Sequence, residues 1–295
     1  MGKPITEARA ELKGFHQLVK KLSELAPEAL ATKIVKQNEL GIMSYTREPV
    51  GVSAIFSPWN YPVFTCGNFL LTSVLAGNSA VIKHSHFTPL IGKHFEEAFK
   101  YAGTENIVRE LMITHTDAVK LYQLPEIGFV GFTGSTEVGR NVQDEIADHR
   151  FIDYTLELGG SDAAYVAEDA DIDYAAQDLA RGAFYNAGQS CNGVARIYVH
   201  NAVYDEFLSK ITGHAARLNL GNPMNEDTTL GPLTQPDKIS SIQLQVEEAA
   251  GQGGRILFGG LPTQDSEGKG QFFEPTIIAD AQNDMSIMVI FENKE

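Results

Sequence analysis

From residue 51 onward, short runs of strand-forming residues alternate with runs whose apolar side chains recur at helical spacing. Strands are predicted at 51–56, 79–83, 107–113 and 127–132. Helices are predicted at 62–76 and 88–102, the second with Thr88 as its N-cap, and a short helix separates the last two strands. This alternation predicts an α/β fold with a parallel sheet covered by helices on both faces. Ligands of such sheets bind at the carboxyl ends of the strands, so a site is expected at the turns 58–60, 83–86 and 133–136.

A second α/β stretch follows the first. Its predicted strands are 154–158, 163–166 and 195–200, and its predicted helices are 171–186 and 201–218. A long loop runs from Asn222 to Pro236. The glycine-rich piece at 251–255 is interpreted as a helix-to-strand turn rather than a phosphate loop.

Charge and hydropathy limit the partners and the compartment. The formal net charge of -15 argues against nucleic acid or an anionic membrane as the main partner, because phosphate groups must be met by Lys and Arg. No run approaches the roughly 20 apolar residues of a membrane span. The first residues lack an apolar signal core, and although Gly2 and Thr6 match a short myristoylation pattern, a cytoplasmic protein is expected.

The two cysteines stand in different contexts. Cys66 lies in the apolar run PVFTCGNFLLTSVLAG, which indicates an inert core thiol. Cys191 follows a helix that is expected to end at Gly188, and it is flanked by polar residues that a substrate could reach. The thiolate is the reactive form, so a nucleophilic Cys191 needs a base or surroundings that lower its pKa.

Glu157 and Asn60 each end a predicted strand. Glu157, in LELGGSD, is expected to be buried, and burial would raise its pKa toward the range of a general base. The alternative is a salt-bridged strand residue. Asn60, in SPWNYP, offers an amide donor to a developing oxyanion, or serves only as a turn residue.

The segment GFVGFTGSTEVGR leads a strand through Gly134 and Ser135 into a helix. Backbone N–H groups at a helix start that is approached through glycine bind phosphate groups. The spacing differs from G-x-G-x-x-G, so on its own it is a weak sign of a dinucleotide.

Five segments in order, SPWNYP, VIKHS, FTGSTEVG, LELGG and FYNAGQSC, resemble the motifs of the NAD(P)-dependent aldehyde dehydrogenase superfamily. The spacings agree, with 23 residues from Asn60 to Lys83 and 34 from Glu157 to Cys191. The resemblance runs from about Arg47 to Met285. It implies a Rossmann-like parallel-sheet cofactor domain over 1–156 and an α/β catalytic domain over 157–295, both incomplete, with 37–49 in an oligomerisation hairpin.

The resemblance also implies a role for each matching residue. Cys191 would attack an aldehyde to give a thiohemiacetal, with the Asn60 amide and the Cys191 N–H holding the oxyanion. Hydride transfer to the nicotinamide would leave a thioester, which water activated by Glu157 would hydrolyse. Lys83 would bind the adenosine ribose of NAD or NADP, and Ser135 the pyrophosphate. The other implied cofactor-binding residues are Pro58, Trp59, His86, Gly134 and Gly159.

His86 departs from the family pattern, since members that prefer NAD often carry a glutamate there. Without that carboxylate, a 2′-phosphate is not repelled, so we expect dual or NADP-leaning cofactor use. His84 and His86 lack a nearby third ligand in the sequence, so no metal site is predicted.

The family fold is longer than this chain at both ends, so the resemblance implies a truncated chain. The segment after Met288 lacks the E-x-F-G-P motif, and Glu292 is therefore given no role. We expect the isolated chain to be unstable or inactive, because the missing segments would leave sheet edges unpaired and apolar faces uncovered. Full-length relatives form homo-oligomers, which is doubtful for this chain. Two alternatives stay open: a catalytically impaired remnant that acts as an interaction module, and a cofactor-independent cysteine esterase. Semialdehydes and aliphatic or aromatic aldehydes all remain candidate substrates.

Overall fold

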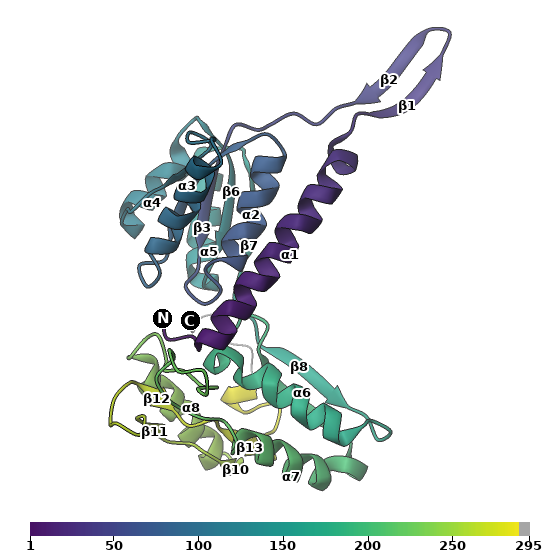
Figure 1. The fold of residues 1–295 in the computed structure, drawn as a ribbon. Coiled ribbons are helices and arrows are strands. Elements are labelled where there is room, and N and C mark those ends of the chain that lie inside the picture. Colours follow the sequence, from purple (N-terminus) through teal and green to yellow (C-terminus); the bar gives the residue numbers. More distant parts are fainter. Residues whose placement is uncertain (289–295) are drawn as a thin grey trace. The chain divides into compact units, whose positions relative to one another are not determined.

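The computed structural model describes residues 1–288, which form two compact units (Figure 1). The first unit is Ala10–Leu158, and the second combines Met1–Arg9 with the described residues 159–288. Helix α1 (Ile5–Leu30) contributes residues to both. Within residues 1–288, the chain contains no helix with the length and apolar character of a membrane span. Glu292 lies outside the described residues.

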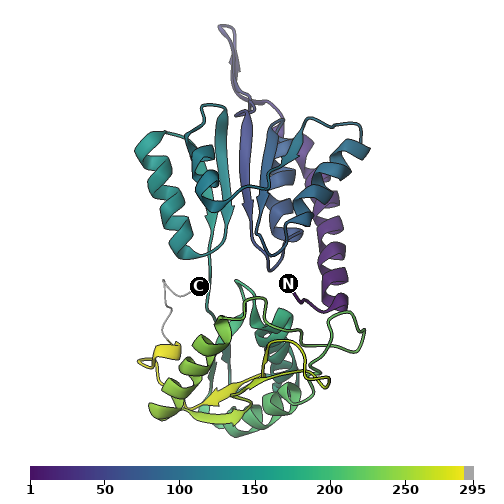
Figure 2. The ribbon, with the colours of Figure 1, turned by 90° about the vertical axis from the view of Figure 1, so that its left-hand side faces the viewer.

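The first unit is built on a five-stranded, all-parallel sheet (Figure 2). Its strand order is β5-β4-β3-β6-β7. The strands are β3 (Val52–Ser57), β4 (Ser79–His84), β5 (Val108–Glu110), β6 (Ile127–Thr133) and β7 (Asp153–Glu157). The helices between them are α2 (Phe64–Leu75), α3 (Leu90–Tyr101), α4 (His115–Gln123) and α5 (Thr136–His149). The strand–helix alternation predicted from the sequence is therefore present.

Two apolar clusters cover the two faces of this sheet, because successive strand side chains point to opposite faces. Ile55 of β3 packs in the cluster that contains Leu70 of α2 and Phe95 of α3. Its neighbour Phe56 packs in the cluster formed with α4 and α5, next to the ring of Tyr122. Helices α2 and α3 thus cover one face of the sheet and α4 and α5 the other.

The chain adds strands to the two sides of β3 in turn, and all of these strands remain parallel. After β3 the chain builds β4 and β5 outward on one side, then returns to place β6 against the other side of β3. Such a topological switch point opens a crevice at the carboxyl ends of the two strands. The turns after Ser57 and Thr133 lie at that point, so the fold places the expected binding turns there.

Two local expectations were wrong. The sequence grouped 154–158 with the second α/β stretch, but β7 pairs with β6 in the first sheet, so Glu157 lies in the first unit. Thr88 was expected to cap α3, but the N-cap is Pro89, and the buried Thr88 hydroxyl makes no hydrogen bond within the described residues. Pro89 has helical angles, the helix runs from Leu90, and no side chain caps its start.

Strands β1 (Lys33–Asn38) and β2 (Gly41–Tyr45) form an antiparallel hairpin that begins earlier than the predicted segment 37–49. Every residue of both strands is exposed, and Ile34, Val35, Ile42 and Met43 are large apolar side chains. An exposed apolar hairpin is typical of an interaction surface. Its role in joining subunits stays a prediction.

The described part of the second unit holds three small two-stranded sheets and, after residue 159, three α-helices. Its strands are β8 (Asp162–Val166), β9 (Val194–Val199), β10 (Arg255–Phe258), β11 (Pro262–Thr263), β12 (Phe272–Phe273) and β13 (Ile277–Ala279). Its α-helices are α6 (Ile172–Phe184), α7 (Tyr204–Ala215) and α8 (Lys238–Gly251), and its 3-10 turns are η1 (Tyr185–Gly188), η2 (Asn201–Val203) and η3 (Ser286–Met288). The parallel pair β8–β9 packs its core side chains with α6 and α7.

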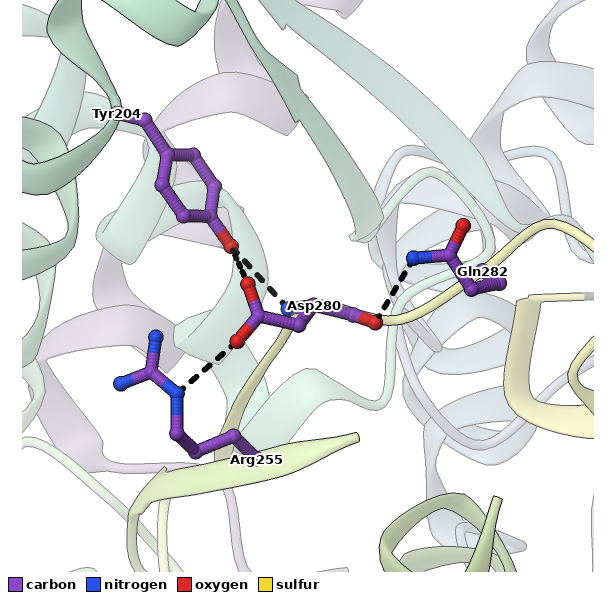
Figure 3. Close-up of polar contacts among 4 residues, drawn as sticks. All are labelled: Tyr204, Arg255, Asp280 and Gln282. Carbon is purple, nitrogen blue, oxygen red and sulfur yellow. Dashed lines mark hydrogen bonds and ion pairs between the residues drawn. The ribbon is translucent and has the colours of Figure 1, made fainter. Parts of the chain in front are cut away.

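Asp280 joins the end of β13 to two neighbouring elements (Figure 3). Its carboxylate accepts hydrogen bonds from the Tyr204 hydroxyl at 2.7 Å and from Arg255 Nε at 3.0 Å. These two donors hold the pKa of the Asp280 carboxyl below its usual range. The residue has a positive φ of 61°, which Asp tolerates better than most residues. The cluster therefore fixes a left-handed turn at the edge of the second unit.

Candidate active site

The carboxyl ends of four adjacent strands gather most of the predicted site residues of the first unit. In the register of the sheet, Ser57 pairs with His84, and Thr133 pairs with Glu157. The segments that follow these residues, 58–60, 85–86 and 134–135, therefore lie along one edge of the sheet. Lys83 and Glu157 belong to the same edge, while Cys191 and Gly159 belong to the second unit.

The turn after β3 fixes the orientation of the Asn60 side chain. Asn60 Oδ1 accepts a hydrogen bond from the backbone N–H of Tyr61 at 3.0 Å, so the amide oxygen is held by its own turn. The half-buried Trp59 ring meets Phe87, from the turn after β4, edge to face at a centroid distance of 6.3 Å. An amide held by its oxygen presents its nitrogen as a donor, which is the polarity that an oxyanion requires.

Lys83 is buried at the end of β4, with 8% of its surface exposed. Its Nζ lies 3.5 Å from the carbonyl oxygen of His84, and no acidic side chain among residues 1–288 pairs with it. Burial lowers the pKa of the Lys83 amine, because desolvation disfavours the charged form. A buried cation without an acidic partner is costly unless an anion binds nearby.

Three histidines surround Lys83 with different exposures. His84 is buried and stacks on Phe95, and burial together with the Lys83 charge lowers the pKa of its ring to about 4. His86 is exposed, and its ring lies 6.2 Å from that of His115 at the start of α4. The Lys83 charge lowers the pKa of His115. The described residues hold no cluster of three or more potential metal ligands.

The turn after β6 leads directly into α5, as the sequence predicted. Ser135 is the N-cap of α5, and its Oγ accepts a hydrogen bond from the Val138 N–H at 3.4 Å. A Cβ at Gly134 would stand 2.6 Å from the Phe132 ring, so only glycine fits there without displacement. Helix α5 starts three residues after the end of β6, so its first turn lies at the carboxyl edge of the sheet, and a helix start of this kind favours an anion.

Glu157 is exposed rather than buried, contrary to the expectation from its flanking leucines. In the edge strand β7, exposure alternates with the strand period: Leu156 is half-buried and Glu157 points to the opposite face. Its side chain is accessible to water, and its backbone carbonyl accepts a hydrogen bond from the Gly134 N–H at 3.0 Å. The expected burial of the Glu157 carboxylate is therefore absent from the described structure.

Cys191 is exposed in a loop of the second unit, as the sequence predicted, and Cys66 is fully buried. Burial raises the pKa of the Cys66 thiol to about 12, which makes it inert at neutral pH. The helix before Cys191 ends at Phe184 rather than at Asn186, because Asn186 and Ala187 adopt left-handed angles with φ of 54° and 56°. Left-handed backbone costs about 1–2 kcal/mol per residue, so contacts must hold this turn.

Side chains from distant segments hold the loop that carries Cys191. The Asn186 amide donates to the Gln189 carbonyl at 3.1 Å, and the Gln189 amide donates to the Asn186 carbonyl at 3.0 Å. Gln189 Oε1 also accepts from the Thr234 N–H at 2.9 Å. A Cβ at Gly160 would lie 2.3 Å from the Cys191 carbonyl oxygen, so the second glycine of LELGG packs against the nucleophile backbone. No sequence pattern indicated the role of Thr234 or the close approach of Gly160.

Comparison with known proteins places this arrangement in a family. The sequence profile of the "Aldehyde dehydrogenase family" matches residues 1–289. The chain belongs to the aldehyde dehydrogenase family. The family match begins at residue 1 rather than near Arg47, so α1 and the β1–β2 hairpin are part of it. The α/β fold with a Rossmann-like parallel sheet, expected from the resemblance, is confirmed.

Relatives of this aldehyde dehydrogenase chain are longer than it is. A probable NADP(+)-type succinate-semialdehyde dehydrogenase of Sinorhizobium fredii is 31% identical over 290 residues, which cover 97% of this chain and 58% of that protein. The betaine aldehyde dehydrogenase of Bacillus subtilis is 30% identical over 295 residues, which cover 97% of this chain and 59% of that protein. The chain thus spans less than two thirds of the length of these relatives.

Solved structures show the same relation. A succinic semialdehyde dehydrogenase from Streptococcus pyogenes in complex with NADP+ matches with a TM-score of 0.89 and 29% identity, over 97% of this chain and 62% of that chain. An NAD-dependent aldehyde dehydrogenase from Sinorhizobium meliloti also matches with a TM-score of 0.89 and 29% identity, over 97% of this chain and 57% of that chain. The fold of the shared part is therefore that of the aldehyde dehydrogenases.

The chemistry of the sheet edge fits a nicotinamide dinucleotide. A buried ammonium without an acidic partner among the described residues and a serine-capped helix start approached through glycine both suit phosphate and ribose groups. Lys83 would hold the adenosine ribose, and Gly134 and Ser135 the pyrophosphate. Pro58 and Trp59, in the turn after β3, would lie next to the cofactor at the switch point.

Proposed function

We propose that this chain oxidises an aldehyde to a carboxylic acid with NAD or NADP, through a covalent intermediate on Cys191. The observation that carries the proposal is an exposed thiol on a braced loop, in a family member whose sheet edge suits a dinucleotide. The Cys191 thiolate adds to the aldehyde carbon and forms a C–S bond, and the electron pair of the C=O bond moves to oxygen. In this proposal the Asn60 amide and the Cys191 N–H donate hydrogen bonds to that oxygen.

The oxidation of this thiohemiacetal to a thioester is the chemistry that the bound dinucleotide supplies. Glu157 then accepts a proton from water, whose oxygen attacks the thioester carbon. The C–S bond breaks, the carboxylic acid leaves, and Cys191 regains its thiolate. The exposure of Glu157 supports this role, because a hydrolytic base must meet water.

His86 and His115 support the use of NADP by this chain. The two imidazole rings lie 6.2 Å apart between centroids, and the Lys83 charge lowers the pKa of His115. A 2′-phosphate is attracted by such groups, whereas a glutamate would repel it. We expect NADP to bind at least as tightly as NAD.

Turnover with several aldehydes tests the proposal. The names of relatives make a semialdehyde with a terminal carboxylate the first substrate to assay, followed by aliphatic and aromatic aldehydes. Formation of NADPH or NADH that disappears in Cys191→Ser and persists in Cys66→Ala is the expected result. Ester hydrolysis without cofactor, in the absence of aldehyde oxidation, would instead support a cysteine esterase. No turnover, together with binding to a longer relative, would support an interaction module.

A further inference from the structure

The N-terminal helix reaches the loop that carries Cys191 through one carboxylate. Glu7 Oε2 accepts a hydrogen bond from the backbone N–H of Asn186 at 2.9 Å, across 179 positions of sequence. Asn186 is the first of the two left-handed residues and is 1% exposed. Both residues belong to the second unit. Since a left-handed turn persists only where its surroundings hold it, this contact acts on the part of the loop under most strain.

We infer that Glu7 is a positioning residue for Cys191, because its carboxylate holds the Asn186–Ala187 turn from which the nucleophile loop departs. The inference rests on the proposed role of Cys191 only for its consequence in turnover. Glu7 touches no reacting atom in this account. It acts through Asn186, and Asn186 acts through its hydrogen bonds with Gln189, two residues before the nucleophile.

The bond is sensitive to the charge of Glu7. Burial raises the pKa of this carboxyl to about 7, although the Asn186 N–H and the charges of Lys3 and Arg181 oppose the shift. An ionised carboxylate is a stronger acceptor than a neutral one, so the contact strengthens as the pH rises through about 7. The titratable side chains that line a cavity of about 260 Å³ with Glu7 are Arg181, Tyr185 and His214. Lys3 adds a positive charge from the N-terminal segment.

The charge of Glu7 has the opposite effect on global stability. A carboxyl whose pKa is raised in the folded state contributes stability that is complete below its unfolded value and is lost as the pH rises through about 7. The ionised form therefore braces the loop while it weakens the fold. A residue with a purely structural role would change the protection of the loop and the global stability in the same direction.

Hydrogen exchange of the 185–191 segment tests the inference without any requirement for turnover. In the wild-type chain, protection corrected for intrinsic rates should rise as the pH is raised from 6 to 8. Glu7→Ala, which removes the acceptor, should lose protection by about tenfold, the factor that corresponds to one hydrogen bond. Glu7→Gln keeps an acceptor and should retain protection near that of the wild type at pH 6, with no rise toward pH 8.

Glu24→Ala and Glu24→Gln are matched controls, because Glu24 is exposed on the same helix. Both should leave the exchange of 185–191 unchanged. Equal protection in Glu7→Ala and Glu24→Ala, or pH-independent protection in the wild type, would overturn the inference. Should the chain oxidise aldehydes, Glu7→Ala should lower kcat about tenfold with a smaller change in KM. If Glu7→Ala loses loop protection and the wild-type chain shows no turnover, the positioning role of Glu7 is supported and only the proposed function is rejected.

Discussion

The backbone N–H of Gly134 donates a hydrogen bond to the carbonyl oxygen of Glu157 at 3.0 Å. This bond joins the turn expected to bind the pyrophosphate to the residue expected to activate water. Both stand at the carboxyl ends of neighbouring parallel strands, where Thr133 and Glu157 are partners in register. A displacement of the Gly134 turn is therefore transmitted to the end of β7.

Gly134→Ala should weaken dinucleotide binding. The new Cβ would meet the Phe132 ring at 2.6 Å, so either the ring or the turn has to move. We expect the Kd for NADPH to rise about tenfold, because a shift of the helix start misplaces several N–H donors at once. Fluorescence titration measures it. Gly213→Ala is the control, since that glycine of α7 has open space around it and should bind NADPH normally. Equal affinities for the two variants would contradict the assignment of the phosphate site.

Cys191 should react with iodoacetamide far faster than Cys66 does. Cys191 is exposed, whereas Cys66 is fully buried with its thiol pKa raised to about 12. Because only the thiolate reacts, we expect one rapidly labelled thiol at pH 8, with the second slower by about 100-fold or more. Mass spectrometry of the intact chain counts the labels. Cys66→Ala should keep the rapid label and Cys191→Ser should lose it, and the reverse pattern would identify the wrong nucleophile.

Gly160→Ala should disturb Cys191 although it changes no polar group. A Cβ there would lie 2.3 Å from the Cys191 carbonyl oxygen, which is too close for any real contact. The loop has to shift, so we expect the rate of Cys191 alkylation to change at least about threefold and kcat to fall about tenfold or more. Gly251→Ala, at a position with nothing within 4 Å, serves as the control. An unchanged alkylation rate in Gly160→Ala would show that the loop adapts without consequence.

Cofactor preference should depend on pH through the His115 imidazole, whose pKa the Lys83 charge lowers. The Lys83 charge lowers the pKa of His115, so this ring is neutral at pH 8 and gains charge only as the pH falls below its ordinary range. We expect the ratio of the Kd for NAD to the Kd for NADP to grow about threefold or more between pH 7 and 5, as His115 takes up a proton. His86→Glu should reverse the preference, by repulsion of the 2′-phosphate. His94→Glu is the control, because His94 is exposed on α3, and it should leave the ratio of the two Kd values unchanged. A strong preference for NAD at every pH would refute the assignment.

The first sheet could be predicted from the sequence because the spacing of apolar residues identifies each of its strands and helices separately. The run Val52–Ser57 is buried along almost its whole length, and α2 and α5 follow with apolar side chains at helical spacing. The position of the candidate site residues of that unit was predictable for the same reason, since they follow or end strands of a parallel sheet. Their roles stay predictions. The exposure of Glu157 was not predictable from its neighbours alone. It depends on β7 being an edge strand, which is a property of the strand order.

The left-handed turn before Cys191 could not be predicted from the sequence. Neither Asn186 nor Ala187 requires a positive φ, and their neighbours favour continued helix. The turn exists because Glu7 and Thr234 supply hydrogen bonds from segments far away in the chain. A local pattern cannot report contacts of that range, so the helix was predicted to end two residues too late.

His84→Phe should remove an acid sensitivity of the first unit. The His84 ring is 5% exposed and stacks on Phe95, and neither of its nitrogens has a hydrogen-bond partner among the described residues. Burial and the Lys83 charge lower the pKa of the ring to about 4, below its unfolded value of 6.5. A group with a lowered pKa contributes stability that is present above the unfolded value and is lost as the pH falls through the folded one.

Between pH 6.5 and 4 the wild-type chain should therefore lose up to about 3 kcal/mol of unfolding free energy through this ring alone. A phenylalanine fits the same apolar contacts and cannot take up a proton, so His84→Phe should lose correspondingly less over that range. Urea unfolding followed by circular dichroism at pH 7.5, 6.5, 5.5 and 4.5 measures the difference. His94→Phe, at an exposed position of the helix that carries Phe95, should follow the wild type. Parallel curves for the wild type and His84→Phe would mean that the ring is protonated in the folded chain with another group to receive its charge.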